Sequence, residues 1–206
     1  MNIPLKVNGE KFMETNSQVN KENNKFEIIE SQIRECFGKV VYSHKTHEKC
    51  ADILTTLHSR IKLWQIILSA ITTTSFLVSI FGGTKVGAII GSILAAILFA
   101  LNMYTKDYDL GVIAKKHSDA ANELWNIRES YLSLITDIKN RIVLIEQIQL
   151  KRDELQNKLF EIYKGSPKTN FKAYNKARKA LKLDEELTFS DEEIDNFLPK
   201  KLRKNQ

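Results

Sequence analysis

Two long runs of apolar residues follow one another in the middle of the chain. The first covers residues 63–81 and the second residues 86–105, and only the four residues 82–85 separate them. A helix rises about 1.5 Å per residue, so each run matches the roughly 30 Å thickness of the hydrocarbon core of a bilayer. We therefore expect a transmembrane helical hairpin over 63–105, rather than two core helices of a soluble domain.

The segments on either side of this hairpin show the period of amphipathic helices. Apolar residues recur at steps of three and four from residue 26 to residue 58, which predicts an amphipathic helix over 26–62 that leads directly into the first span. A coiled-coil-like pattern continues to Ile162 and predicts a long helix over 106–164. Its apolar stripe must pair with the 26–62 helix or with copies of itself, and we expect a homo-oligomer.

The two ends of the chain are polar. Residues 1–25 are rich in Asn, Lys and Glu and lack periodicity, which predicts a disordered segment. At the other end, Gly165 begins a helix stop, and we expect short helices and a basic tail over 165–206. Ser190 and Glu193 have the spacing of a capping box. We expect the tail to be a solvated surface, with contact to anionic lipid as the alternative, and we expect no direct binding of nucleic acid.

Charge is distributed unevenly along the chain of 206 residues. It carries 31 Lys and Arg against 25 Asp and Glu, yet residues 63–105 contain a single charged side chain, Lys85. This distribution excludes a plain soluble enzyme domain. The two apolar runs predict a multi-pass membrane protein. Basic residues precede the first span and follow the second, so the positive-inside rule predicts that both termini lie in the cytoplasm. The sequence thus predicts an all-α membrane protein with a two-span hairpin and long cytoplasmic helices.

Polar side chains form a stripe on the first span, within an arc of about 120° on a helical wheel. The stripe consists of Gln65, Ser69, Thr72, Ser75 and Ser79. These side chains either form hydrogen bonds between helices or line a water-filled path built by several copies. The second span instead carries small residues four positions apart, Gly87, Gly91 and Ala95, which predict close packing within the hairpin.

Motifs of known catalytic and cofactor sites are absent from the sequence. It contains no P-loop, dinucleotide fingerprint, H-E-x-x-H or G-x-S-x-G. His44, His47 and Cys50 have a spacing that supplies two metal ligands or at most three, whereas a closed zinc site needs four. We therefore expect no enzymatic activity, no metal and no cofactor. Cys36 and Cys50 are too few for a disulfide framework and are expected to be reduced.

The segment 38–75 resembles the SLATT family, the two-transmembrane effector domains associated with SMODS nucleotidyltransferases and SLOG nucleotide-sensing domains in prokaryotic conflict systems. The residues that carry the resemblance are Tyr42, His44, Lys45, Thr46, His47, Glu48, Ala51, Asp52, Arg60 and Trp64. The resemblance implies an antiviral membrane effector that permeabilises the inner membrane when a nucleotide signal or partner triggers it, causing growth arrest or cell death. It also implies a cytoplasmic sensor or nucleotide-generating enzyme as a partner.

Two functions remain open from the sequence. One is the permeabilising effector, and the other is a membrane-anchored scaffold that recruits a cytoplasmic partner and does not form a pore. In either case the string 44–48 lies several turns before the first span. We expect it to pack against the helix that follows the second span, near His117 and Asp119, and to transmit a cytoplasmic signal.

Overall fold

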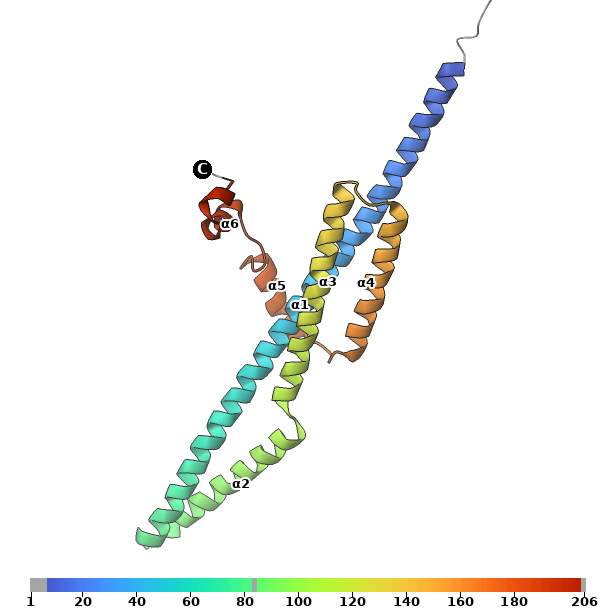
Figure 1. Ribbon diagram of the computed structural model, residues 1–206. Coiled ribbons are helices and arrows are strands. Elements are labelled where there is room, and N and C mark those ends of the chain that lie inside the picture. Colours follow the sequence, from blue (N-terminus) through green and yellow to red (C-terminus); the bar gives the residue numbers. More distant parts are fainter. Residues whose placement is uncertain (1–6, 83–84, 205–206) are drawn as a thin grey trace, which may run out of the picture. The chain divides into compact units, whose positions relative to one another are not determined.

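A computed structural model describes the backbone of residues 7–82 and 85–204, with side chains from residue 21 onward. These residues form helices and contain no strand, so the protein is all-α (Figure 1). The helices are α1 (Val7–Gly82), α2 (Lys85–Asp107), α3 (Leu110–Lys139), α4 (Ile145–Gly165), α5 (Phe171–Lys182), α6 (Asp191–Phe197) and the short 3-10 helix η1 (Lys200–Leu202).

Helix α1 is longer than the pattern of apolar residues predicts. It runs for 76 residues without interruption and covers both the amphipathic segment 26–62 and the first apolar run. The structure describes a helix from Val7 onward, where a disordered segment over 1–25 was expected, while residues 1–6 lie outside the described residues. Extending an existing helix needs no new nucleus, and no proline follows Pro4 in this segment, so the helix continues into polar sequence.

The single helix expected over 106–164 is divided in the structure. Helix α3 begins at Leu110 and ends at Lys139, and α4 begins at Ile145. Arg141 has a positive φ of 53°, a left-handed conformation that ends a helix. The side chain of Gln147 accepts a hydrogen bond from the backbone N–H of Leu144 at 3.3 Å, which caps the start of α4.

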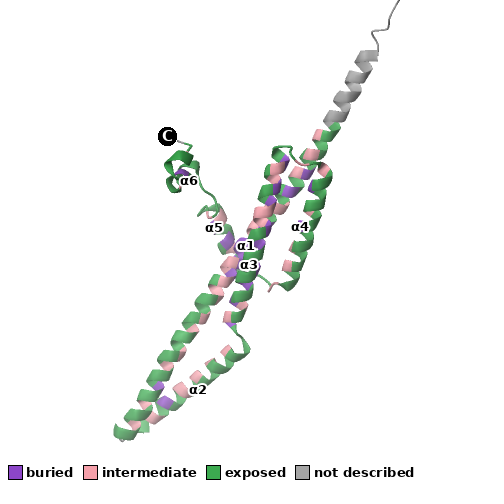
Figure 2. Cartoon of the chain, in the orientation of Figure 1, coloured by how far each residue is buried: buried purple, intermediate pink, exposed green. Residues whose placement is uncertain are grey.

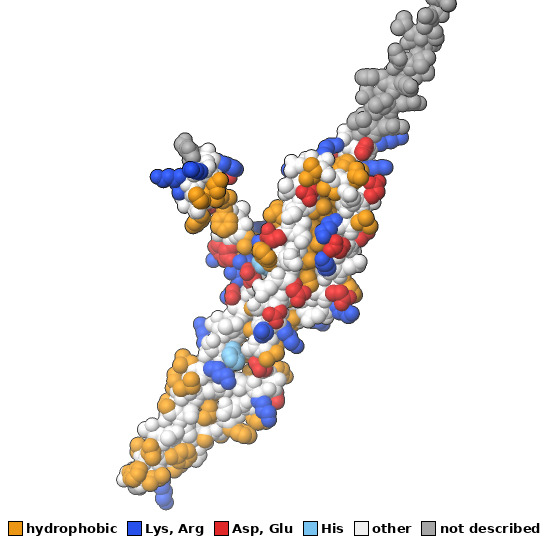
Figure 3. All heavy atoms as spheres, in the orientation of Figure 1, with side chains coloured by type: hydrophobic (Ala, Val, Ile, Leu, Met, Phe, Trp, Pro, Cys, Tyr) orange, Lys and Arg blue, Asp and Glu red, His pale blue; other side chains and the backbone are white. Residues whose placement is uncertain are grey.

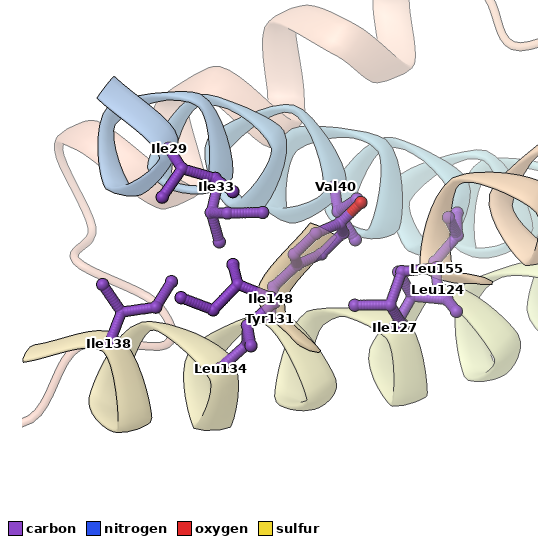
Figure 4. Close-up of a cluster of buried hydrophobic side chains, with 10 residues drawn as sticks. All are labelled: Ile29, Ile33, Val40, Leu124, Ile127, Tyr131, Leu134, Ile138, Ile148 and Leu155. Atoms are coloured by element: carbon purple, nitrogen blue, oxygen red, sulfur yellow. The ribbon is translucent and has the colours of Figure 1, made fainter. Parts of the chain in front are cut away.

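One compact unit comprises the chain up to His44 together with Ala120–Ser166. Its core combines side chains from α1, α3 and α4, so the apolar stripes of these helices are buried against one another (Figure 4). The core residues are Ile29, Ile33, Val40, Leu124, Ile127, Tyr131, Leu134, Ile138, Ile148 and Leu155. Each buried Leu or Ile contributes about 1.5–3 kcal/mol. The 26–62 helix is therefore one partner that covers the stripe of α3 and α4.

The second compact unit comprises Lys45–Asp119 and Pro167–Gln206. Its spans, the end of α1 and α2, are long and apolar enough to cross a membrane, and only 0% and 6% of their most apolar windows are buried. Figure 2 shows both as largely exposed, and Figure 3 shows hydrophobic side chains gathered over the far end of the hairpin. Phe81, for example, is 86% exposed. A surface of this kind is stable in contact with lipid.

The C-terminal segment of this unit consists of α5, α6 and η1. Helix α4 ends at Gly165, two residues before Pro167, where the helix stop was expected. The side chain of Asn170 caps α5 by accepting a hydrogen bond from the backbone N–H of Ala173 at 2.9 Å. The predicted capping box of Ser190 and Glu193 at the start of α6 is confirmed.

Candidate functional site

The polar stripe of the first span lies mainly on the face of α1 that meets α2. Gln65 Nε2 donates hydrogen bonds to Asn102 Oδ1 at 2.9 Å and to Thr105 Oγ1 at 3.1 Å, both on α2. Asn102 and Thr105 were missed in the sequence analysis, although they are the polar residues at the end of the second run. Gln65 therefore forms hydrogen bonds between the two helices of the hairpin, which is one of the two roles expected for the stripe.

The other members of the stripe are covered to different extents. Thr72 is buried, Ser75 and Ser79 are half-buried, and Ser69 is exposed. The hydroxyl of Thr72 donates to the carbonyl oxygen of Leu68 at 2.7 Å, and that of Ser75 donates similarly within α1. Such bonds satisfy a hydroxyl in an apolar environment without help from water. In this arrangement Ser69 is the stripe residue that is open to the surroundings of the hairpin.

The small residues of the second span allow α2 to approach the backbone of α1. A Cβ atom placed on Gly87 would lie 2.8 Å from the carbonyl oxygen of Ser75, which is closer than real Cβ atoms come. A Cβ atom on Gly91 would lie 3.4 Å from Ser75 and Phe76, an ordinary contact distance. Ala95, the third residue of this pattern, is half-buried. Gly87 and Gly91 thus lie at the contact between the spans, as in other small-residue helix pairs.

The string 44–48 reaches α3 through a pair of histidines. His47 Nδ1 lies 3.0 Å from His117 Nδ1, and the ring centroids are 5.0 Å apart. Both side chains are buried, whereas Asp119 is exposed. A hydrogen bond between two imidazoles needs one N–H donor and one unprotonated acceptor, so at least one of the two rings is neutral. Burial lowers the pKa of His117 and thereby favours its neutral form.

Two lysines of the same stretch of α1 bind one carboxylate of the C-terminal segment. Lys49 Nζ lies 3.1 and 3.3 Å from the two carboxylate oxygens of Glu186. Lys45 also forms an ion pair with Glu186, and its Nζ lies 2.8 Å from a carboxylate oxygen of Glu48. The side chain of Lys45 is only 9% exposed. No local pattern in the sequence indicates Glu186, which is 137 residues away from Lys49.

These ion pairs keep the buried lysine charged. Burial has the largest effect on the pKa of Lys45 and acts to lower it, but hydrogen bonds to Glu186 and Glu48 outweigh burial and raise the pKa. The pKa of Glu186 is lowered, chiefly by its hydrogen bond with Lys45. A buried charge of this kind is strongly destabilising when its partner is removed, because it is then left without compensation.

The other residues of the 38–75 string differ in how far they are buried. Tyr42 is half-buried, whereas Asp52, Arg60 and Trp64 are exposed. Cys50 is buried, and burial raises the pKa of its thiol. Within the part of the chain that the structure describes, no group of three or more His, Cys, Asp or Glu side chains is arranged to hold a metal ion. His44, which is also buried, does not extend the histidine pair into such a group.

In a comparison with protein families, one family model matches most of the chain. Neither a curated protein nor a solved structure matches it. One family model matches residues 29–193, a range that includes the histidine pair, the lysine cluster and the whole hairpin. The matching family is a family of two-transmembrane effector domains, which agrees with the two exposed apolar spans. The chain therefore belongs to the SMODS and SLOG-associating 2TM effector domain family 4, SLATT_4.

Proposed function

We propose that this protein is a membrane effector of a prokaryotic antiviral system, which permeabilises the inner membrane when a nucleotide signal or partner triggers it. The result is growth arrest or death of the cell. The observation that carries the proposal is that a hairpin of an effector family leaves the most apolar windows of its two spans 0% and 6% buried, whereas the helices outside it form a core of their own. The effect is exerted on the bilayer itself, and no catalytic step is involved.

In this proposal both termini lie in the cytoplasm. Support comes from the basic residues that flank the hairpin, compared with Lys85 alone in the turn. A cytoplasmic sensor or a nucleotide-generating enzyme then has direct access to the helical unit. Several copies associate to act on the membrane. The large exposed apolar side chains of α4, such as Leu150 at 72% exposure, support further association of this unit.

In the active state the two spans separate, and the polar stripe of the first span lines the pore. In the arrangement described above, Thr72, Ser75 and Ser79 are at least half-covered, and Gln65 is bonded to α2. Opening of the hairpin would exchange these contacts for contacts with water and with other copies. Ser69 is exposed already and is the first candidate to line such a path.

A second function, a membrane-anchored scaffold, is favoured by the same contacts. A stripe that is used within the hairpin needs no pore to explain it, because polar side chains also stabilise simple helix pairs in membranes. In that function the hairpin only anchors the helical unit, which recruits a cytoplasmic partner. The two functions differ in whether the sequence of the hairpin matters beyond membrane insertion.

The test is an induction experiment in bacteria, with and without the genes that flank the effector gene. Membrane potential is followed with a voltage-sensitive dye and permeability with propidium. We expect the full chain to depolarise the cells. We expect Ser69→Leu to weaken the ion flux, although the variant protein is present in the membrane fraction in the same amount as the wild type. Ser92→Leu, which changes an exposed hydroxyl residue of α2, is the matched control. Full membrane potential in every strain, with the protein inserted, would contradict the proposal.

A further inference from the structure

The C-terminal segment, residues 167–204, has little apolar surface buried against the rest of its unit. The buried residues of α5 are three alanines, Ala173, Ala177 and Ala180. Most of the large apolar side chains of the segment are exposed instead, including Leu183 at 74% and Phe197 at 82%. Segments with few buried apolar contacts open at a lower free energy than the protein as a whole. Polar contacts therefore matter more than usual for holding this segment in place.

Glu186 of this segment forms ion pairs with both Lys45 and Lys49 of α1. Asn170, which caps the start of α5, also donates a long hydrogen bond of 4.0 Å from its side chain to the sulfur of Cys50 on α1. All of these partners lie within residues 45–50 of α1, the same stretch that contacts α3 through His47. The C-terminal segment is thus fastened to the part of α1 that carries the family string.

The backbone on both sides of Glu186 is strained. Glu185 has a φ of 50° and Leu187 a φ of 74°, so both non-glycine residues are in the left-handed region. A bulky residue such as Leu rarely adopts a positive φ, and such strain persists only where other contacts hold it. Hydrogen bonds from the N–H of Glu186 to Ala180 O at 2.9 Å and from Thr188 to Glu185 O at 3.0 Å shape the turn. The turn presents Glu186 to the two lysines.

We propose that Lys45, Lys49 and Glu186 form a releasable ionic latch that holds the C-terminal segment on α1 and restrains the effector until it opens. Strain in the turn lowers the cost of opening, and the few buried side chains of α5 allow the segment to leave as one piece. Opening removes the segment from the stretch of α1 that continues, without a break in the helix, into the first span. The restraint rests on the proposed function, whereas the latch itself does not.

The latch is tested by hydrogen exchange of the full chain in nanodiscs, read at the amides of α5. Glu186→Gln removes the charge and should raise exchange in α5 about tenfold. Glu185→Gln, which changes the exposed neighbouring acid, is the matched control and should leave exchange within about twofold of the wild type. Combining Lys49→Gln with Glu186→Gln should add little to Glu186→Gln alone, because both changes remove the same interaction.

A glycine substitution tests the strain from the opposite direction. Leu187→Gly relieves the positive φ and should slow exchange in α5 by a few-fold relative to the wild type. This variant keeps Lys45, Lys49 and Glu186. Slower exchange at the amides of α5 would therefore show that the exchange rate reports opening of the C-terminal segment and not unfolding of the whole protein. Unchanged exchange in Glu186→Gln, or equal increases in Glu186→Gln and Glu185→Gln, would overturn the latch.

The restraint is tested with the same variants in cells, by the membrane potential. Glu186→Gln should depolarise cells at a lower level of induction than the wild type, and Glu185→Gln should not. Faster exchange in α5 with no change in the depolarisation threshold would overturn the restraint while leaving the membrane activity intact. If no variant and no trigger depolarises cells, the proposed function fails, and the exchange result still decides whether the latch exists.

Discussion

Adding one methyl group at Gly87 should weaken the hairpin, whereas the same change at Gly91 should not. The Cβ atom of an alanine at position 87 would lie 2.8 Å from the carbonyl oxygen of Ser75 and 3.3 Å from the backbone nitrogen of Ser79. Backbone atoms cannot rotate away as a side chain can, so α2 must move by several tenths of an ångström. At position 91 the nearest atoms, in Ser75 and Phe76, are 3.4 Å away, and the methyl group fits.

The expected magnitudes follow from this difference. Overpacking costs about 1–3 kcal/mol, and the better helix propensity of alanine returns about 1 kcal/mol. Gly87→Ala should therefore destabilise the hairpin by up to about 2 kcal/mol. Gly91→Ala receives the gain in propensity without the clash and should be neutral or slightly stabilising.

The assay is a titration from mild detergent into SDS, followed by the fluorescence of Trp64 near the start of the first span. The chain has 2 tryptophans, and the other, Trp125, is exposed, so Trp125→Phe leaves Trp64 as the sole reporter. We expect a lower SDS midpoint for Gly87→Ala than for Gly91→Ala in this background. Equal midpoints for the two variants would refute the close backbone approach at Gly87.

Three further predictions concern other parts of the molecule. Gln65→Leu should lower the SDS midpoint by the equivalent of about 1 kcal/mol, since it removes the hydrogen bonds to α2; an unchanged midpoint would contradict their contribution. Leu124→Ala should destabilise the three-helix core by about 2–5 kcal/mol in thermal unfolding, and a loss below 1 kcal/mol would contradict its close packing. Because burial lowers the pKa of His117 from its ordinary value of 6.5, the unfolded chain binds more protons there, so stability should fall as the pH drops below 6.5. This slope should be smaller in His117→Asn, and an identical slope would refute the role of the His47–His117 pair.

The features predictable from sequence are those that one segment encodes alone. The run 63–105, in which Lys85 is the single charged side chain, is sufficient to predict the hairpin, because a bilayer imposes a fixed length on apolar helices. The capping box at Ser190 is likewise a local signal. The turn between α3 and α4 escaped prediction because no glycine or proline marks it and apolar residues recur across it. Its left-handed residue is Arg141, a residue type that gives no indication of a turn.

The contacts between distant segments were predictable only in part. The approach of His47 to His117 was expected, since the string precedes one span and His117 follows the other, and a hairpin brings such positions together. The partner of Lys45 and Lys49 was not expected, because Glu186 is one of several acids in the tail and nothing in its neighbours sets it apart. The polar stripe was predicted as a stripe, but a helical wheel does not tell which partner covers it. In the structure α2 covers most of it.

In the proposed function, the hairpin of this effector acts on the membrane and is more than an anchor. A direct measurement replaces residues 63–105 with an unrelated two-span hairpin of the same length and compares the membrane potential of induced cells that also carry the genes flanking the effector gene. Both chains must be present in equal amounts in the membrane fraction. We predict rapid depolarisation by the native chain and none by the chimera. Equal growth arrest by both chains, without depolarisation, would contradict the claim and identify the protein as a membrane-anchored scaffold.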